Sequence, residues 1–309
     1  MDEKQVKVSL WCVPRSLSTV LTKCLSVIDG MEVYFELFSH ADTASNVFES
    51  VVGRRLPFQL DGNEKDYDKM SELFNAMSIG RKIIQRRASF FDIKQDLENA
   101  SSKYVVNKDI AHTYALEYLP RGFRYVFLTR EPSRVFASYR KSRILAAAPS
   151  MPESRQPEHA TDERVFDIIR DDVASIRPKS WYEKQHELWK YVREHIEPNP
   201  IIIDAFDLAS EPRNILRAFC NDVGFPYSDD LLQWTPSQEF PTNFVLPLEN
   251  MSQAVGQHLY ATALNSTSFV APRESGPIPR DQLTDDVIQC VDHSMPFYRE
   301  MYQSRLRPS

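Results

Sequence analysis

The sequence predicts an α/β protein with a mostly parallel central sheet flanked by helices. Short apolar, strand-like runs alternate with amphipathic, helix-like segments along most of the 309 residues. This alternation is typical of a parallel sheet covered on both faces. The sequence shows neither an internal repeat nor a linker between two cores, so we expect a single domain over residues 1–309.

Five segments have the composition of buried strands. They are VKVSLWCV at 6–13, MEVYFE at 31–36, YVVNKD at 104–109, RYVFLTR at 124–130 and PIIIDAF at 200–206. Helices are predicted near 18–28, 42–52, 66–87 and 92–99, from Pro132 onward, and at 179–196, 212–223 and 282–303. Residues 146–160 contain three prolines and few large apolar side chains, so we predict a mobile loop there.

Composition narrows the class of protein. The net charge of −6 gives no overall attraction for nucleic acid or anionic membranes. The sequence contains no run of about 18 apolar residues, which a membrane span needs. None of the four cysteines forms a C-x-x-C pair, which favours a reducing compartment. We therefore expect a cytoplasmic protein with no nucleic-acid or membrane partner; its oligomeric state stays open.

The turn that follows the first strand has the composition of an anion site. Arg15 follows Pro14, and Ser16, Ser18 and Thr19 precede a helical pattern. Ligands bind beyond the carboxyl ends of parallel strands, and the free N–H groups of a helix N-terminus favour anions there. Arginine adds a permanent charge and a forked donor. The alternative is that a serine only caps the helix and Arg15 is solvated.

A second motif, FLTREPSRVFASY at 127–139, places Arg130 at a strand end and Ser138 eight residues later. Two helical turns separate them, so both can reach one anion. Alternatively, Arg130 pairs with Glu131 and Ser138 is a packing residue. A Walker A motif needs G-x-x-x-x-G-K-[ST]. Residues 14–20 contain no glycine and no lysine, which argues against an ordinary ATP or GTP hydrolase.

Together the two motifs resemble those of sulfotransferases that use 3′-phosphoadenosine 5′-phosphosulfate (PAPS). That family's first signature, P-[KR]-S-x-[ST]-T, binds the 5′-phosphosulfate, and its second, R-x-P with a serine eight residues after the arginine, binds the 3′-phosphate. The chain has PRSLST at 14–19, and Arg130-Glu131-Pro132 with Ser138. The resemblance implies a P-loop NTPase-like sulfotransferase fold. It also implies sulfuryl transfer from PAPS to a hydroxyl or amine of a small-molecule acceptor, with release of 3′-phosphoadenosine 5′-phosphate (PAP).

The resemblance also names the residues that bind PAPS. They are Arg15, Ser16, Leu17, Ser18, Thr19, Arg130, Ser138 and, from the segment APRESG at 271–276, Arg273. Arg273 is the nearest counterpart of an R-K-G element that the family has late in its sequence. This chain has no exact copy of that element. The well-studied cytosolic enzymes have lysine in place of Arg15 and glycine in place of Leu17. Arginine can neutralise developing charge but cannot give up its proton.

Sulfuryl transfer needs a base that takes the acceptor's proton. We rank Glu36, at the end of the second strand, ahead of His112, Asp109 and His40. Glu36 resembles the base of sulfotransferases that use a glutamate, and the cytosolic branch has a catalytic histidine near a strand end like that of His112. The alternative for Glu36 is an ion pair with Arg15 or Lys108 that only organises the pocket.

Lys108 precedes the histidine candidate as a lysine does in the cytosolic branch. It is expected to be a second cation near the sulfuryl group. The alternatives are that it pairs with Asp109 or lies at a solvated strand end. The chemistry needs no metal, and we expect no metal site. Alcohols, phenols, amines and carbohydrates all remain possible acceptors.

Other functions stay open at this point. One is a nucleotide-dependent kinase of related fold, and another is a PAP-binding protein without turnover. A third is elimination through a transient sulfate ester.

Overall fold

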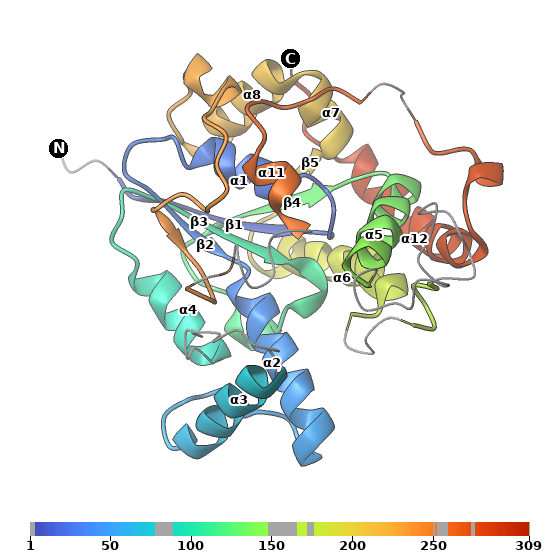
Figure 1. Ribbon diagram of the computed structural model, residues 1–309. Coiled ribbons are helices and arrows are strands. Elements are labelled where there is room, and N and C mark those ends of the chain that lie inside the picture. The colour runs from blue at the N-terminus through green and yellow to red at the C-terminus, as the bar shows by residue number, and fades with distance from the viewer. Residues whose placement is uncertain are drawn as a thin grey trace.

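The computed structural model describes residues 4–77, 89–147, 166–171, 176–249, 251, 259–272 and 276–308. Its strands form one six-stranded sheet in the order β5-β4-β1-β3-β2-β6 (Figure 1). The strands are β1 (Val6–Cys12), β2 (Met31–Phe35), β3 (Tyr104–Ile110), β4 (Arg124–Thr129), β5 (Ile201–Asp204) and β6 (Phe244–Val245). Every neighbouring pair is parallel, so the predicted α/β class with a parallel sheet is confirmed.

The helices follow the strands along the chain. They are α1 (Ser18–Leu25), α2 (Leu37–Val52), α3 (Glu64–Met77), α4 (Phe90–Asn99), α5 (Pro132–Ala147), α6 (Trp181–His195), α7 (Ala205–Ser210), α8 (Pro212–Val223), α11 (Ala261–Leu264) and α12 (Asp285–Gln303). Short 3-10 helices are η1 (Ala111–Thr113), η2 (Leu116–Tyr118), η5 (Pro178–Ser180), η6 (Asp229–Leu232) and η7 (Arg280–Gln282).

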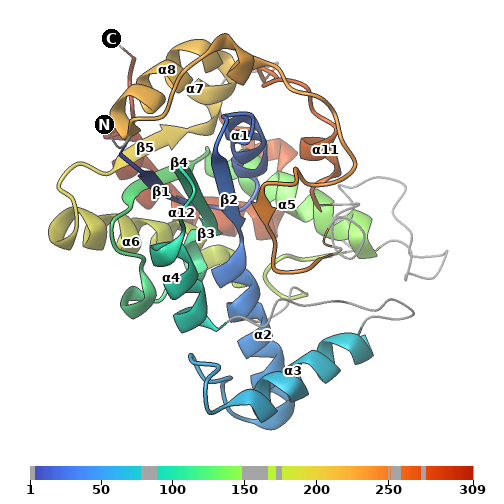
Figure 2. The ribbon, with the colours of Figure 1, turned by 90° about the vertical axis from the view of Figure 1, so that its left-hand side faces the viewer.

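Alternating side chains divide the core between the two faces of the sheet. In β1, Leu10 and Cys12 belong to a core that includes apolar residues of α1, α7 and α8. Trp11, between them, belongs to the opposite core, which includes α4 and α6. Figures 1 and 2 show these two groups of helices on either side of the strands. Helices α5 and α12 share a third core, and the α2–α3 pair extends away from the sheet (Figure 1).

The sheet topology brings the site residues together at the carboxyl ends of the strands. The register pairs Cys12 of β1 with Ile110 of β3 and with Leu128 of β4, so these three strands end at the same level. The chain leaves β1 toward β2 on one side and reaches β4 on the other, which makes the end of β1 a switch point where ligands bind. The residues that follow β1, β2, β3 and β4 therefore meet there.

Several boundaries differ from the sequence-based expectation. Strand β5 ends at Asp204, because the Asp204 carboxylate accepts hydrogen bonds from the N–H groups of Phe206 and Asp207 and so caps α7. Strand β6 lies in a region with no strand-like run long enough to predict. Helix α5 continues to Ala147, so 146–147 are helical, and 148–160 of the expected loop lie outside the described residues.

Candidate active site

The turn between β1 and α1 has an unusual backbone. Arg15 has φ 62° and Leu17 has φ 71°, both in the left-handed region. For residues other than glycine this conformation costs on the order of 1–3 kcal/mol and tends to occur at functional sites. It is also the conformation that a glycine, present at the Leu17 position in the well-studied enzymes, adopts without cost.

Backbone N–H groups of this turn are available to an anion. The first bond within α1 runs from Leu21 N to Leu17 O, 2.9 Å, so the N–H groups of residues 18–20 precede the helical ladder. The Ser16 hydroxyl donates to Val13 O at 2.7 Å and is fully buried. Ser16 therefore braces the turn through its side chain, whereas the N–H groups at the helix N-terminus are the kind of donors that favour an anion.

The two sequence motifs meet at this turn. Arg130 Nη1 donates to Arg15 O at 2.8 Å, and Arg15 Nε donates to Ser138 Oγ at 3.3 Å. Burial lowers the pKa of both guanidinium groups, and arginine nevertheless stays protonated in proteins. Among the described residues, no carboxylate lies within ion-pair distance of either arginine. The site thus holds two partly desolvated cations that lack a counter-ion from the described part of the chain.

A second group of contacts in the site is built around Glu36. Its backbone is left-handed, with φ 55°, and its N–H donates to Lys108 O at 2.7 Å. The Lys108 ammonium donates to Glu36 Oε1, and the Tyr260 hydroxyl donates to Glu36 Oε2. Lys108 is 1% exposed; burial disfavours its charge, but the Glu36 carboxylate outweighs that effect and the pKa of Lys108 is raised.

A pocket of about 410 Å³ joins these two groups of contacts. Its lining includes the anion-binding turn, the Glu36 cluster and a set of apolar and aromatic side chains. The residues that line it include Arg15, Leu17, Ser18, Thr19, Glu36, Lys108, Ile110, His112, Arg130, Ser138, Tyr139, Trp181, Leu259 and Tyr260. The pocket therefore places anion-binding groups, a carboxylate and an apolar surface around one space.

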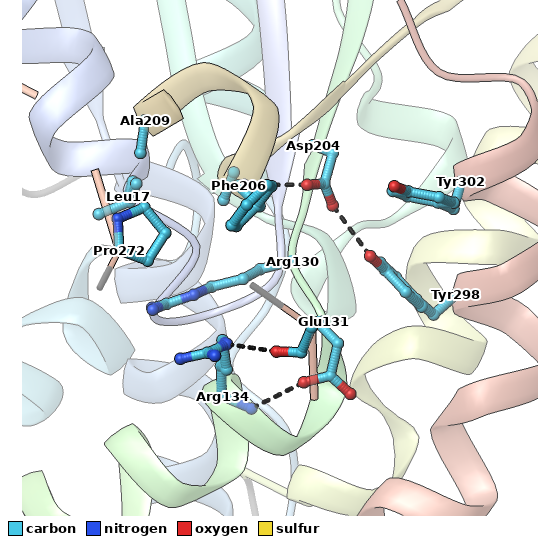
Figure 3. A pocket seen from close by; sticks show the side chains of 12 residues that line it. Leu17, Arg130, Glu131, Arg134, Asp204, Phe206, Ala209, Pro272, Tyr298 and Tyr302 are labelled. Atoms are coloured by element: carbon cyan, nitrogen blue, oxygen red, sulfur yellow. Dashed lines mark hydrogen bonds between the residues drawn. The ribbon is translucent and has the colours of Figure 1, made fainter. Parts of the chain in front are cut away.

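A second pocket of about 240 Å³ adjoins the first and shares Leu17 and Arg130 with it. Figure 3 shows the Arg130 side chain between those of Phe206 and Arg134, with Tyr298 and Tyr302 of α12 nearby. Asp204 accepts a 3.1 Å hydrogen bond from the Tyr298 hydroxyl, and burial raises the pKa of Asp204 to about 6. This pocket combines aromatic surface with polar groups next to Arg130.

Asp109 follows Lys108 in β3 and is fully buried. Its carboxylate accepts hydrogen bonds from the N–H groups of Phe38, Ser39 and Ile110, at 2.7, 2.9 and 2.9 Å. Burial raises the pKa of Asp109 to about 7. Asp109 is not among the described residues that line the pocket, and its bonds anchor the first turn of α2, which Glu36 precedes.

The two histidine candidates are separated by the fold. His112 lines the pocket and stacks on Trp181, with ring centroids 5.7 Å apart. Burial lowers the pKa of His112 to about 3, so its imidazole is neutral at pH 7 and its protonation is disfavoured. His40 packs against Phe74, burial lowers its pKa to about 4, and it is not one of the described pocket-lining residues.

Sequence reasoning missed Tyr260. It contacts Glu36 across 224 positions of sequence, and no motif surrounds it, so no local pattern could have identified it. Arg273, the predicted late nucleotide contact, lies outside the described residues; its neighbours Pro272 and Gly276 line the second pocket.

Among the described residues, no group of three or more His, Cys, Asp or Glu side chains is arranged to hold a metal ion. No helix among them has the length and apolar content to cross a membrane.

Comparison with known proteins supports the resemblance. Residues 196–305 match the family model of the sulfotransferase domain, a segment that contains β5, α7, α8 and α12. Both motifs lie before residue 196, so the motifs and the family-model match are separate observations. The predicted resemblance to the sulfotransferase superfamily is confirmed by this match, which supports sulfuryl transfer as the class of chemistry. No curated protein matches the sequence significantly.

Two solved structures are similar at low identity. One is the sulfotransferase domain from the curacin biosynthetic pathway, at 15% identity and TM-score 0.46, covering 98% of this chain and 99% of that one. The other is the sulfotransferase domain from the Synechococcus PCC 7002 olefin synthase, at 15% identity and TM-score 0.40, covering 94% of this chain and 96% of that one.

Proposed function

We propose that the protein transfers a sulfuryl group from PAPS to a hydroxyl or amine of a small-molecule acceptor and releases PAP. One observation carries this proposal: Arg15 and Arg130, predicted to bind the two anionic ends of PAPS, meet in a pocket that Glu36 also lines. Phosphoryl- and sulfuryl-type transfer depends mainly on positioning and on charge stabilisation. The pocket offers both.

The residues present fit a ligand with two separated anionic groups. The N–H groups of residues 18–20 and the Arg15 guanidinium would hold the phosphosulfate. Arg130 and Ser138 would hold the 3′-phosphate. Arg130 lines both pockets, so the second pocket, with Phe206 and Tyr298, is the proposed place for the nucleoside (Figure 3).

The proposed reaction forms a bond from the acceptor oxygen or nitrogen to sulfur and breaks the bond from sulfur to the bridging oxygen of the 5′-phosphate. Arg15 would stabilise the negative charge that develops on that bridging oxygen. Glu36 would take the acceptor's proton, with Lys108 as a further cation beside it. His112, neutral and in the same pocket, is the second candidate for the base.

The pocket lining includes an aromatic group in which the rings of His112 and Tyr139 both contact Trp181. Ile110 and Leu259 add apolar surface to the lining. We propose that the acceptor places an apolar or aromatic part against this surface while its reacting group lies between Arg15 and Glu36.

A transfer assay tests this function. The protein is incubated with PAPS and, separately, an aliphatic alcohol, a phenol, a primary amine and a carbohydrate, and PAP and product masses are measured. We expect PAP formation that depends on the acceptor and falls sharply in Glu36→Gln, with His112→Gln as the comparison that ranks the two bases. Product mass also separates a sulfate ester from an alkene formed by elimination. PAP binding without turnover of any acceptor would favour the non-catalytic alternative.

A further inference from the structure

Glu36 is held from two sides. Lys108 donates to one carboxylate oxygen and Tyr260 to the other. A carboxylate has about four lone-pair positions, so these two bonds fix the group's orientation and still leave positions that can accept a proton. Lys108 comes from the neighbouring strand β3, whereas Tyr260 comes from a distant part of the chain.

Tyr260 is built to donate this hydrogen bond. Its ring packs edge-on against Phe35 and Phe240, with centroids 5.6 and 5.4 Å away. It is 9% exposed, and burial, followed by the charge of Glu36, raises the pKa of its hydroxyl well above 10. The hydroxyl therefore stays protonated throughout the working range of an enzyme, and it points its proton at Glu36 Oε2.

The preceding residue contacts Arg15, which lines the same pocket. Leu259 O accepts a 3.1 Å hydrogen bond from Arg15 Nη1. Two consecutive residues thus bind two groups that line the same pocket, Arg15 through a backbone carbonyl and Glu36 through a side chain. Any shift of this dipeptide changes both contacts together.

The same segment is anchored to α1. Lys23 is 4% exposed, and its ammonium donates to Leu264 O and to Ser266 O, the latter at 3.0 Å. These carbonyls lie at the carboxyl end of α11, where a cation is favoured. Trp234 Nε1 also donates to Ser266 Oγ at 3.1 Å. The segment is therefore fixed on the helix whose N-terminus forms the anion site.

From these contacts we infer that Tyr260 is a positioning residue that holds the Glu36 carboxylate toward the reacting group. We further infer that Lys23 supports it by fixing residues 259–266 on α1. The inference rests on the proposed role of Glu36 as the base.

Tyr260→Phe tests the inference, because it keeps the ring and removes only the hydroxyl. With PAPS and an acceptor that the wild-type protein sulfates, we expect kcat to fall about tenfold, a part of the usual contribution of a general base. The acid limb of the pH–rate profile should move to higher pH, because Glu36 has lost a bond that favours its charged form. The Kd for PAP should stay within about twofold. Combined with Glu36→Gln, Tyr260→Phe should cause no further loss, since it acts through that carboxylate.

Tyr125→Phe is the matched control. It also removes a buried hydroxyl, one that donates to Pro120 O at 2.9 Å, and Tyr125 is not one of the described residues that line either pocket. We expect wild-type kcat and pH profile. Lys23→Met, as a second variant, should lower kcat.

The outcomes separate the two proposals. An active wild-type protein whose Tyr260→Phe variant keeps the same kcat and pH profile would overturn this inference alone. The inference would also be overturned if adding Tyr260→Phe to Glu36→Gln lowered kcat further by the same factor as in the wild-type protein. A wild-type protein that turns over no PAPS would overturn the proposed function, and this inference with it.

Discussion

Arg130 donates a 2.8 Å hydrogen bond from Nη1 to the backbone carbonyl of Arg15, which joins the residues that follow β4 and β1. The contact spans 115 positions of sequence and brings two like charges to the switch point of the sheet. Partly desolvated like charges disfavour each other. Their convergence, with no carboxylate partner among the described residues, is what a site for a polyanion requires.

Arg130→Ala should weaken PAP binding far more than binding of 5′-AMP. Only PAP carries the 3′-phosphate assigned to Arg130, and a charge-assisted hydrogen bond contributes roughly 1.5–3 kcal/mol, or about 10–150-fold in Kd. Calorimetry with both nucleotides measures the difference. Equal losses of affinity for the two ligands would show that Arg130 does not bind the 3′-phosphate.

Arg15→Ala should lower the transfer rate by about 10²–10³, the usual cost of removing one donor that stabilises developing charge. The fold should survive, because the Arg15 side chain donates only to Ser138 Oγ and Leu259 O among the contacts described. Arg15→Lys should retain part of the activity, since it keeps the charge and loses the fork. Rate measurement with parallel thermal unfolding checks this, and unchanged turnover in Arg15→Ala would exclude Arg15 from the mechanism.

Leu17→Gly should be more stable than Leu17→Ala. Both variants lose the same side chain beyond Cβ, but only glycine adopts φ near +71° without strain. The left-handed conformation costs other residues about 1–2 kcal/mol, so we expect a difference of about 1 kcal/mol in the free energy of unfolding, measured in urea. A Leu17→Ala variant as stable as Leu17→Gly would show that the turn carries no such strain.

His112→Gln should make stability less sensitive to acid. Burial lowers the pKa of His112 from 6.5 to about 3 in the folded protein, so between these values the unfolded chain binds a proton that the folded chain does not. The contribution of His112 to the free energy of unfolding is therefore complete above about pH 6.5 and decreases as the pH falls toward 3. Between pH 7 and 5 the wild-type protein should lose about 1–2 kcal/mol more than the variant.

Urea unfolding at the two pH values measures that loss. His195→Gln, at an exposed position of α6, is the control and should behave like the wild-type protein. Identical pH dependence for His112→Gln and the wild-type protein would mean that His112 is solvated in solution.

The sequence was informative where local patterns decide structure. The five longer strands are predictable because their apolar runs are buried, as in Val8 and Leu10, and Pro132 begins α5 as its fixed φ predicts. Strand β6 was not predictable, because two residues that pair with Val33 and Tyr34 leave no local pattern.

The same distinction holds for the site. Arg15 and Arg130 belong to motifs with fixed spacing, and they meet because parallel strands end at one edge. The roles of Ser16 and Asp109 depend on the direction of one side chain each, toward Val13 O and toward the α2 N–H groups, which spacing does not determine. Tyr260 reaches Glu36 only through the packing of Phe35 and Phe240, so the structure was needed to find it.

The most direct test of a PAPS site is a calorimetric titration of the purified protein with PAP, with ADP and with ATP–magnesium. If Arg130 and Ser138 bind a 3′-phosphate, PAP should bind with a micromolar Kd and ADP, which lacks that group, far more weakly. Tight binding of ATP–magnesium together with indifference to PAP would contradict the account and favour a kinase of related fold.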